Sequence, residues 1–185
     1  AQHALEQVFL KCEGHRIGLI VFAGEAVKQF ALTPDYFSAV SFIQDINTEL
    51  ISRQGTRISE ALNLALESIP PSKSNSSAII LITDGEDHDD KALEICENAQ
   101  KRDIAIYTIG IGTEAGVPIP DFQNGKRVGY KTNSKGETVI THLNMNLLKQ
   151  IALKTKGICI QSSPSDLGLK QIFKEIDQLD KTNSS

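Results

Sequence analysis

The sequence predicts an α/β domain with a doubly wound, mostly parallel sheet, helices on both faces, one antiparallel edge strand and a β-hairpin insert. Short, solid apolar runs occur at residues 17–22, 78–83, 105–111 and 157–161. They lack the alternation of a strand with one wet face, which is typical of parallel strands covered on both sides. Between the runs the apolar period becomes helical, and alternating strands and helices favour a parallel sheet with right-handed crossovers.

The helices are predicted from apolar residues that recur three and four positions apart. These stripes place helices at residues 36–46, 58–69, 92–99, 143–152 and 172–179. Asp35 stands where its carboxylate can accept hydrogen bonds from the free amides of the first of these helices. Residues 27–31 follow the first strand closely and are less uniformly apolar, which predicts the antiparallel edge strand of this Rossmann-like sheet.

One stretch, residues 113–141, breaks this alternation with several prolines and glycines. Two polar, strand-like pieces at residues 127–132 and 137–141 flank the sequence Asn133-Ser134-Lys135-Gly136, which is typical of a turn. We therefore predict a β-hairpin insert on the rim of the sheet, with an irregular loop as the alternative.

Size and charge exclude several classes of protein. A chain of 185 residues predicts a single domain, here residues 1–180, followed by a disordered polar tail at residues 181–185. The net charge of −4 and the pI of about 5.6 argue against nucleic-acid binding, which needs clustered cations. No apolar stretch approaches the ~18 residues of a membrane span, so this segment is not expected to insert into a membrane.

The three cysteines, Cys12, Cys96 and Cys159, stand far apart and form no CxxC pair. Their spacing argues against a zinc site. Because each cysteine falls inside an apolar sequence pattern, we predict that all three are small hydrophobic side chains buried in the core. The cysteine pattern does not decide between an oxidising and a reducing compartment.

Candidate metal ligands follow the second apolar run. Ligands of open α/β sheets bind beyond the carboxyl ends of strands, and five carboxylates lie here within residues 84–90. Oxygen ligands in this number suit Mg²⁺, Ca²⁺ or Mn²⁺. For Asp87, Asp89 and Asp90 we favour a solvated loop that caps the next helix. Asp84 is the first residue off a buried strand, which makes it the candidate metal ligand.

Thr56 is the second candidate ligand, because it stands immediately before the cleanest helical pattern. Its ordinary interpretation is the N-cap of that helix. Its hydroxyl is also a neutral oxygen that could ligate a cation approached by Asp84 from the neighbouring strand. No catalytic residue is predicted, and Gly110 and Gly112 lack the third glycine of a dinucleotide site.

Four segments in order and spacing resemble a von Willebrand factor A domain: residues 16–24, Gly55-Thr56, residues 82–86 and residues 106–112. The sequence Pro118-Ile119-Pro120 in the insert, together with the sequences of residues 24–26 and 84–88, is most similar to the bacterial membrane-anchored aerotolerance (Bat-type) subgroup. The resemblance implies a metal-ion-dependent adhesion site, formed in the family by a DxSxS loop after the first strand, a threonine and an aspartate. Thr56 matches that threonine and Asp84 that aspartate.

The sequence departs from the family in one respect: it contains no DxSxS. Residues 1–5 resemble the helix that normally follows that loop, and the family's central first strand is missing as well. Two oxygen ligands are too few to hold Mg²⁺ tightly. We therefore expect Mg²⁺, or Ca²⁺ or Mn²⁺, in the intact domain and weak or no binding in this chain.

The resemblance implies a non-enzymatic protein–protein interaction module whose metal keeps an open position for a partner's carboxylate. The alternatives are a Mg²⁺-dependent phosphoryl-transfer enzyme with Asp84 as metal ligand, and a metal-free structural subunit of a membrane complex. The subgroup further implies a membrane-anchored protein with this domain outside the cytoplasm, in the periplasm, and other membrane-complex subunits as partners. Because a missing central strand leaves two facing strand edges unpaired, we also predict self-association or strand exchange.

Overall fold

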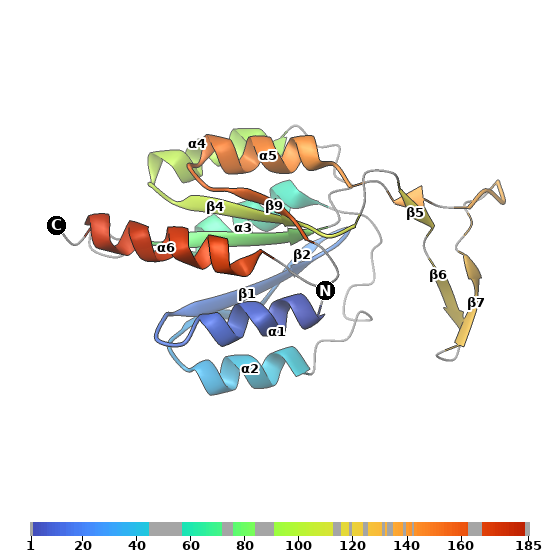
Figure 1. Cartoon of the computed structure of the whole chain (residues 1–185), viewed down its shortest axis with the longest axis horizontal. Coiled ribbons are helices and arrows are strands. Elements are labelled where there is room, and N and C mark those ends of the chain that lie inside the picture. The colour runs from blue at the N-terminus through green and yellow to red at the C-terminus, as the bar shows by residue number, and fades with distance from the viewer. Residues whose placement is uncertain are drawn as a thin grey trace.

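The computed structural model describes residues 2–44, 57–71, 76–83, 91–112, 116–118, 120–123, 126–130, 132, 135–138, 140–141, 143–162 and 168–183 (Figure 1). The helices are α1 (Gln2–Lys11), α2 (Tyr36–Gln44), α3 (Ile58–Ser68), α4 (Lys91–Lys101), α5 (Met145–Lys154) and α6 (Leu169–Asn183). The main strands are β1 (Ile17–Phe22), β2 (Ala26–Thr33), β3 (Ala78–Thr83), β4 (Ala105–Gly110) and β9 (Cys159–Gln161). No described helix is both long and apolar enough to cross a bilayer.

Two sheets form the centre of the described structure. β3, β4 and β9 make a parallel sheet in the order β3-β4-β9, and β1 pairs with β2 in an antiparallel ribbon. Every main strand and helix expected from the apolar patterns is present, with β2 as the antiparallel strand, so the α/β fold class is confirmed. Figure 1 shows β1 and β3 running in the same direction, with helices on both sides.

β4 organises the core because all six of its residues are buried. Ile106 packs into one apolar cluster with α3, α4 and α5, whereas Ala105, Tyr107 and Ile109 pack into a second cluster with α1 and α6. Alternate side chains of a strand point to opposite faces, so β4 joins the two clusters. A third cluster, around Phe9 of α1, covers β1 and includes α2.

The side chain of Thr155 extends the pairing of β4 beyond the short strand β9. Its hydroxyl Oγ1 accepts a hydrogen bond from the amide of Ile106 at 3.0 Å and lies 3.1 Å from the carbonyl oxygen of Ile151. The chain then passes so close to β4 that a Cβ on Gly157 would lie 2.1 Å from the carbonyl oxygen of Ile106. A buried backbone amide needs a partner, and this threonine supplies it.

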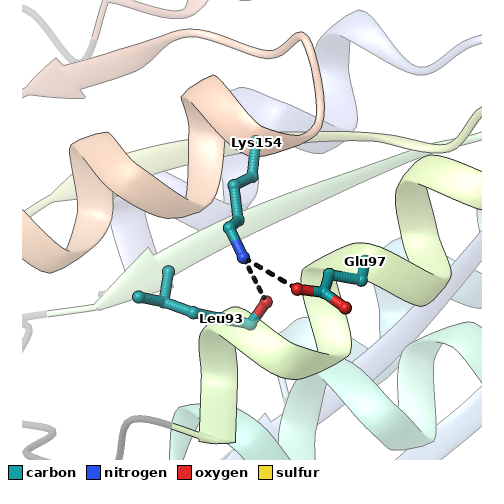
Figure 2. A network of polar contacts seen from close by, with 3 residues as sticks. All are labelled: Leu93, Glu97 and Lys154. Carbon is teal, nitrogen blue, oxygen red and sulfur yellow. Dashed lines mark hydrogen bonds and ion pairs between the residues drawn. The ribbon is translucent and has the colours of Figure 1, made fainter.

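Polar contacts join neighbouring helices at the surface. Nζ of Lys154 on α5 donates to the carbonyl oxygen of Leu93 at 3.3 Å and lies 3.2 Å from a carboxylate oxygen of Glu97, both on α4 (Figure 2). Arg102, just beyond α4, donates to the carbonyl oxygens of Leu66 and Ile69 at the end of α3. The exposed ion pair contributes little, about 0–1 kcal/mol, whereas Arg102 satisfies carbonyls that a helix end leaves open.

The insert is built from strands, but with different partners from those expected. β6 (Pro120–Gln123) pairs with β7 (Lys126–Tyr130), and β5 (Val117–Pro118) pairs with β8 (Ile140–Thr141). The expected pairing of residues 127–132 with 137–141 occurs only as a single bridge between Thr132 and Thr138. The hairpin turn therefore lies between β6 and β7, one strand earlier than predicted. Figure 1 shows β5, β6 and β7 projecting away from the sheets.

The ends of two helices also bear on the sequence predictions. Asp35 caps α2 as expected: its Oδ1 accepts from the amide of Ser38 at 3.0 Å and its Oδ2 from the Ser38 hydroxyl at 2.5 Å. These hydrogen bonds lower the pKa of the Asp35 carboxyl. At the other end of the chain α6 continues to Asn183, so residues 181–183 are helical and do not belong to the expected tail.

We predict that Thr155→Val lowers the free energy of unfolding by about 1–3 kcal/mol, because it leaves the buried Ile106 amide without a partner. Thr155→Ser keeps the hydroxyl and loses one methyl group, for which about 0.8 kcal/mol is expected. Urea unfolding followed by circular dichroism measures both. Equal losses in the two variants would show that the hydroxyl contributes nothing beyond packing.

We also predict a pH-dependent difference between the wild type and Asp35→Asn. The folded state lowers the pKa of Asp35, so its contribution to stability is present above the unfolded-state pKa and is lost as the pH falls through the folded-state value. The advantage of the wild type over Asp35→Asn is therefore largest near neutral pH and shrinks in acid. Thermal unfolding of both proteins across the acid range measures it, and a constant difference would contradict the assignment.

Candidate functional site

The carboxyl ends of the parallel strands define one edge of the molecule, which we call the carboxyl edge: the residues that follow β1, β3, β4 and β9. The amide of Arg57 donates to the carbonyl oxygen of Ala23 at 3.0 Å, which holds the start of α3 beside the end of β1. The amide of Ile111 donates to the carbonyl oxygen of Thr83 at 2.8 Å, which joins the ends of β3 and β4. Segments far apart in the sequence thus meet at this edge.

Side chains tie the end of β9 to the same edge. Ser162 donates to the carbonyl oxygen of Gly110 through both its amide, at 2.9 Å, and its hydroxyl, at 3.0 Å. The Nε2 group of Gln161 donates to the carbonyl oxygen of Gly112 at 3.2 Å. The sequence analysis did not single out Gln161 or Ser162. Both residues stand directly at the end of a strand, so the rule that selected Asp84 could also have identified them.

Both predicted metal ligands, Thr56 and Asp84, lie outside the described residues, as do the acidic residues that follow Asp84. Their immediate neighbours in the chain, Arg57 and Thr83, both lie at the carboxyl edge. The N-cap position of α3 falls on Arg57, whose side chain makes no capping hydrogen bond. The ordinary interpretation of Thr56 as the N-cap residue is therefore displaced by one position.

The predicted metal ligands are Thr56 and Asp84, and a cation site at this edge would depend on them. Within the described ranges, no three or more histidine, cysteine, aspartate or glutamate side chains gather into a group that could hold a metal ion. A threonine hydroxyl and an aspartate carboxylate are hard oxygen donors and fit Mg²⁺, Ca²⁺ or Mn²⁺ in kind. They do not fit in number, because an octahedral ion with two protein ligands keeps most of its water.

Burial argues against a role of Cys12 and Cys96 in metal binding or nucleophilic chemistry. Cys96 is fully buried, and Cys12 and Cys159 are partly buried; all three are free thiols. Burial raises the pKa of Cys12 to about 11. Burial also raises the pKa of Cys96 to about 11, against a smaller opposing effect of the Lys154 charge. At neutral pH these two thiols are protonated, and a protonated thiol is neither nucleophile nor metal ligand.

A large apolar cleft lies between β1 and β3. It has a volume of about 740 Å³ and is lined by both strands and by residues of α1, α3 and α6. In the described part of the chain no strand pairs with the edge of β1 or of β3 that faces the cleft. The two unpaired edges expected from the sequence are therefore present. The cleft reaches from the amino ends of these strands, near Arg16, to Phe22 at the carboxyl edge.

Comparisons with known proteins agree with this architecture. The von Willebrand factor type A domain family matches residues 1–174. The conserved hypothetical protein BatB from Bacteroides thetaiotaomicron is 36% identical, with a TM-score of 0.89, over 97% of this chain and 86% of that chain. An aerotolerance-related membrane protein from Bacteroides fragilis is 33% identical, with a TM-score of 0.85, over 96% of this chain and 88% of that chain.

A more distant structure shares the fold alone. Proximal thread matrix protein 1 from the mussel byssus is described with a zinc-occupied MIDAS (metal-ion-dependent adhesion site) motif. It is 19% identical with a TM-score of 0.64, over 96% of this chain and 39% of that chain. No curated protein matches the chain significantly. The chain is similar to Bat-type aerotolerance proteins. The strand order and the helices on both faces agree with the family match over residues 1–174. This chain therefore belongs to the von Willebrand factor type A domain family, whose members are generally interaction modules.

Proposed function

We propose that the chain binds a partner protein at the carboxyl edge, through a divalent cation held by Thr56 and Asp84. The observation that carries this proposal is the position of their neighbours: Arg57 and Thr83, 26 residues apart in the sequence, both lie at that edge. In open α/β sheets this edge is where ligands bind. Family membership supports the interaction function itself.

Each residue has a distinct part in the proposed site. Asp84 supplies the negative charge that attracts the cation, and Thr56 supplies a neutral oxygen that adds a ligand without adding repulsion. The bound cation would supply positive charge and open coordination positions to a carboxylate of the partner. With two protein ligands the cation alone would bind weakly, and the partner's carboxylate would add a third ligand.

We further propose that the domain works in a membrane-associated complex, outside the cytoplasm. The support is the similarity to a protein described as an aerotolerance-related membrane protein. Other subunits of such a complex are the proposed partners. The carboxyl edge is the surface that we expect them to contact.

We predict that Mn²⁺ broadens the amide NMR signals of Arg57, Thr83 and Ile111 before those at the opposite ends of the strands. A paramagnetic ion broadens nearby signals even when it binds weakly, so the method suits a site with two ligands. Asp84→Ala should abolish the selective broadening and Thr56→Ala should reduce it.

Asp177→Asn is the matched control, because it removes an exposed carboxylate of α6 outside the proposed site. This variant should behave like the wild type. Broadening spread evenly over the acidic surface, and unchanged in Asp84→Ala, would reject the cation site. It would favour the metal-free structural subunit.

We also predict that the chain does not hydrolyse p-nitrophenyl phosphate in the presence of Mg²⁺. Phosphoryl transfer needs a second strand-end carboxylate or a phosphate-binding glycine loop beside Asp84, and the sequence shows neither. Release of p-nitrophenol, followed by absorbance, measures the reaction. Turnover in the wild type that disappears in Asp84→Ala would establish the enzyme alternative.

A further inference from the structure

Three large apolar side chains are exposed to solvent at one end of the molecule. Phe37 is 82% exposed, Leu153 77% and Leu10 64%, the highest values among the large hydrophobic residues that the structure describes. Leu10 lies in the last turn of α1, Leu153 in the last turn of α5 and Phe37 in the first turn of α2. Single exposed hydrophobic residues are ordinary, but three at one end of a fold call for an explanation.

These helix ends lie at the edge of the molecule opposite the carboxyl edge. We call it the amino edge: the residues that precede β1, β3, β4 and β9, together with those that follow β2. The helices α1, α4 and α5 each end shortly before one of these strands. Thr33 at the end of β2 pairs with Ile17 at the start of β1, which places the start of α2 at this edge as well. Figure 1 shows the amino edge at the opposite end of the molecule from the insert strands.

The amino edge is also rich in cations. Its described lysine and arginine residues are all exposed: Lys11, Arg16, Lys101, Arg102, Lys154 and Lys156. The described carboxylates of the same edge are Glu13, Asp35 and Asp103, half as many. In the whole chain the ratio is reversed, with 19 basic against 23 acidic residues. This edge therefore carries a local excess of positive charge.

Ion pairs within the protein compensate only part of this charge. In the described structure Lys156 pairs with Asp103 at 3.1 Å and Lys154 with Glu97 at 3.2 Å. Arg102 donates to backbone carbonyl oxygens, which carry no formal charge. Lysines in the last turn of a helix have an ordinary explanation, because a cation stabilises the negative end of the helix. That explanation covers the cations but not the three exposed apolar side chains.

We propose that the amino edge docks on an anionic phospholipid surface, with the strands upright on the bilayer. The exposed apolar side chains enter the headgroup region, and the cations around them contact the lipid phosphates. Basic residues interleaved with phenylalanine and leucine are the combination that binding at a membrane interface uses. The carboxyl edge then faces away from the lipid, toward a partner. The proposal rests on the membrane association proposed above and assigns a face of this chain to it.

An anionic lipid surface fits the amino edge better than other anionic partners do. A nucleic acid or an acidic protein would engage the cations, but a phosphate backbone or a row of carboxylates offers little to exposed leucine and phenylalanine. The net charge of −4 also argues against a nucleic acid. A lipid surface supplies both phosphate for the cations and an apolar layer for the hydrophobic side chains.

The test follows binding of the 185-residue chain to vesicles by co-sedimentation. One set of vesicles contains phosphatidylcholine and phosphatidylglycerol in a two-to-one ratio, and the other contains phosphatidylcholine alone. We expect binding to the anionic vesicles, and binding weaker by about tenfold or more on the neutral vesicles or in high salt. Binding should persist in EDTA and in Asp84→Ala.

Removing cations tests whether the amino edge is the binding face. Lys11→Gln combined with Lys101→Gln should weaken binding to the anionic vesicles by about tenfold or more. The matched control combines Lys170→Gln with Lys174→Gln, which removes two exposed lysines from the first two turns of α6, a helix that begins beyond the carboxyl end of β9. This control should bind like the wild type. Thermal unfolding checks that both double variants fold.

Changes at the apolar positions test the contact with lipid directly. Phe37→Ser should weaken vesicle binding by about fivefold or more, whereas Val128→Ser, at an exposed position of the insert, should have no effect. Because the chain contains no tryptophan, Phe37→Trp and Val128→Trp report which end of the molecule meets the lipid. The emission of Phe37→Trp should shift to shorter wavelength on binding and be quenched by brominated lipid. That of Val128→Trp should not change.

Equal binding to the two kinds of vesicle, or equal quenching of the two tryptophan variants, would overturn the proposal. So would binding to polyglutamate that is as tight as binding to the anionic vesicles and unaffected by Phe37→Ser, which would assign the amino edge to an acidic protein. A chain that ignores vesicles but still shows the selective Mn²⁺ broadening would reject the lipid face and leave the cation site intact. The two failures are therefore distinguishable.

Discussion

Pairing along both edges of a buried strand is the constraint on which the described structure depends. β4 meets it: β3 and β9 pair with its two edges, and Thr155 supplies the partner for Ile106 where β9 falls short. Because β4 is buried throughout, it carries apolar clusters on both faces and fixes the helices around it. β3 has the same kind of sequence but pairs with only one of the described strands, and its other edge faces the cleft.

The proposed cation site and the cleft share the same two strands. Ala23, which follows β1, accepts the hydrogen bond that holds Arg57, and Thr83 ends β3 on the other side of the cleft. A strand parallel to both would end between these two positions. The proposed cation site therefore borders the gap between β1 and β3.

Solid apolar runs and helical stripes predicted the main strands and helices because burial on both faces leaves a strong, local signal. The insert was less predictable. Its strands are short and polar, and the prediction chose the turn at Asn133 to Gly136 over Asn124-Gly125, the two residues between β6 and β7, which are the stronger hairpin signal. The N-cap of α3 and the end of α6 were missed by one to a few residues, because helix ends depend on local hydrogen bonds that composition does not encode.

The sequence predicted the location of the candidate site but not the residues that form it. The strand-end rule selects the carboxyl edge, but Thr56 and Asp84 are single residues that a helix cap or a solvated loop explains equally well. What favours them is that their neighbours Arg57 and Thr83 lie at the same edge, and that position depends on the fold. If both hold a cation, most of its coordination positions stay open to water, and a partner's carboxylate then contributes a large share of the ligand field. Cation and partner must in that case strengthen each other's binding by the same factor, since coupling between two binding sites is reciprocal. A cation site that is weak alone is therefore compatible with a partner complex that depends strongly on the cation.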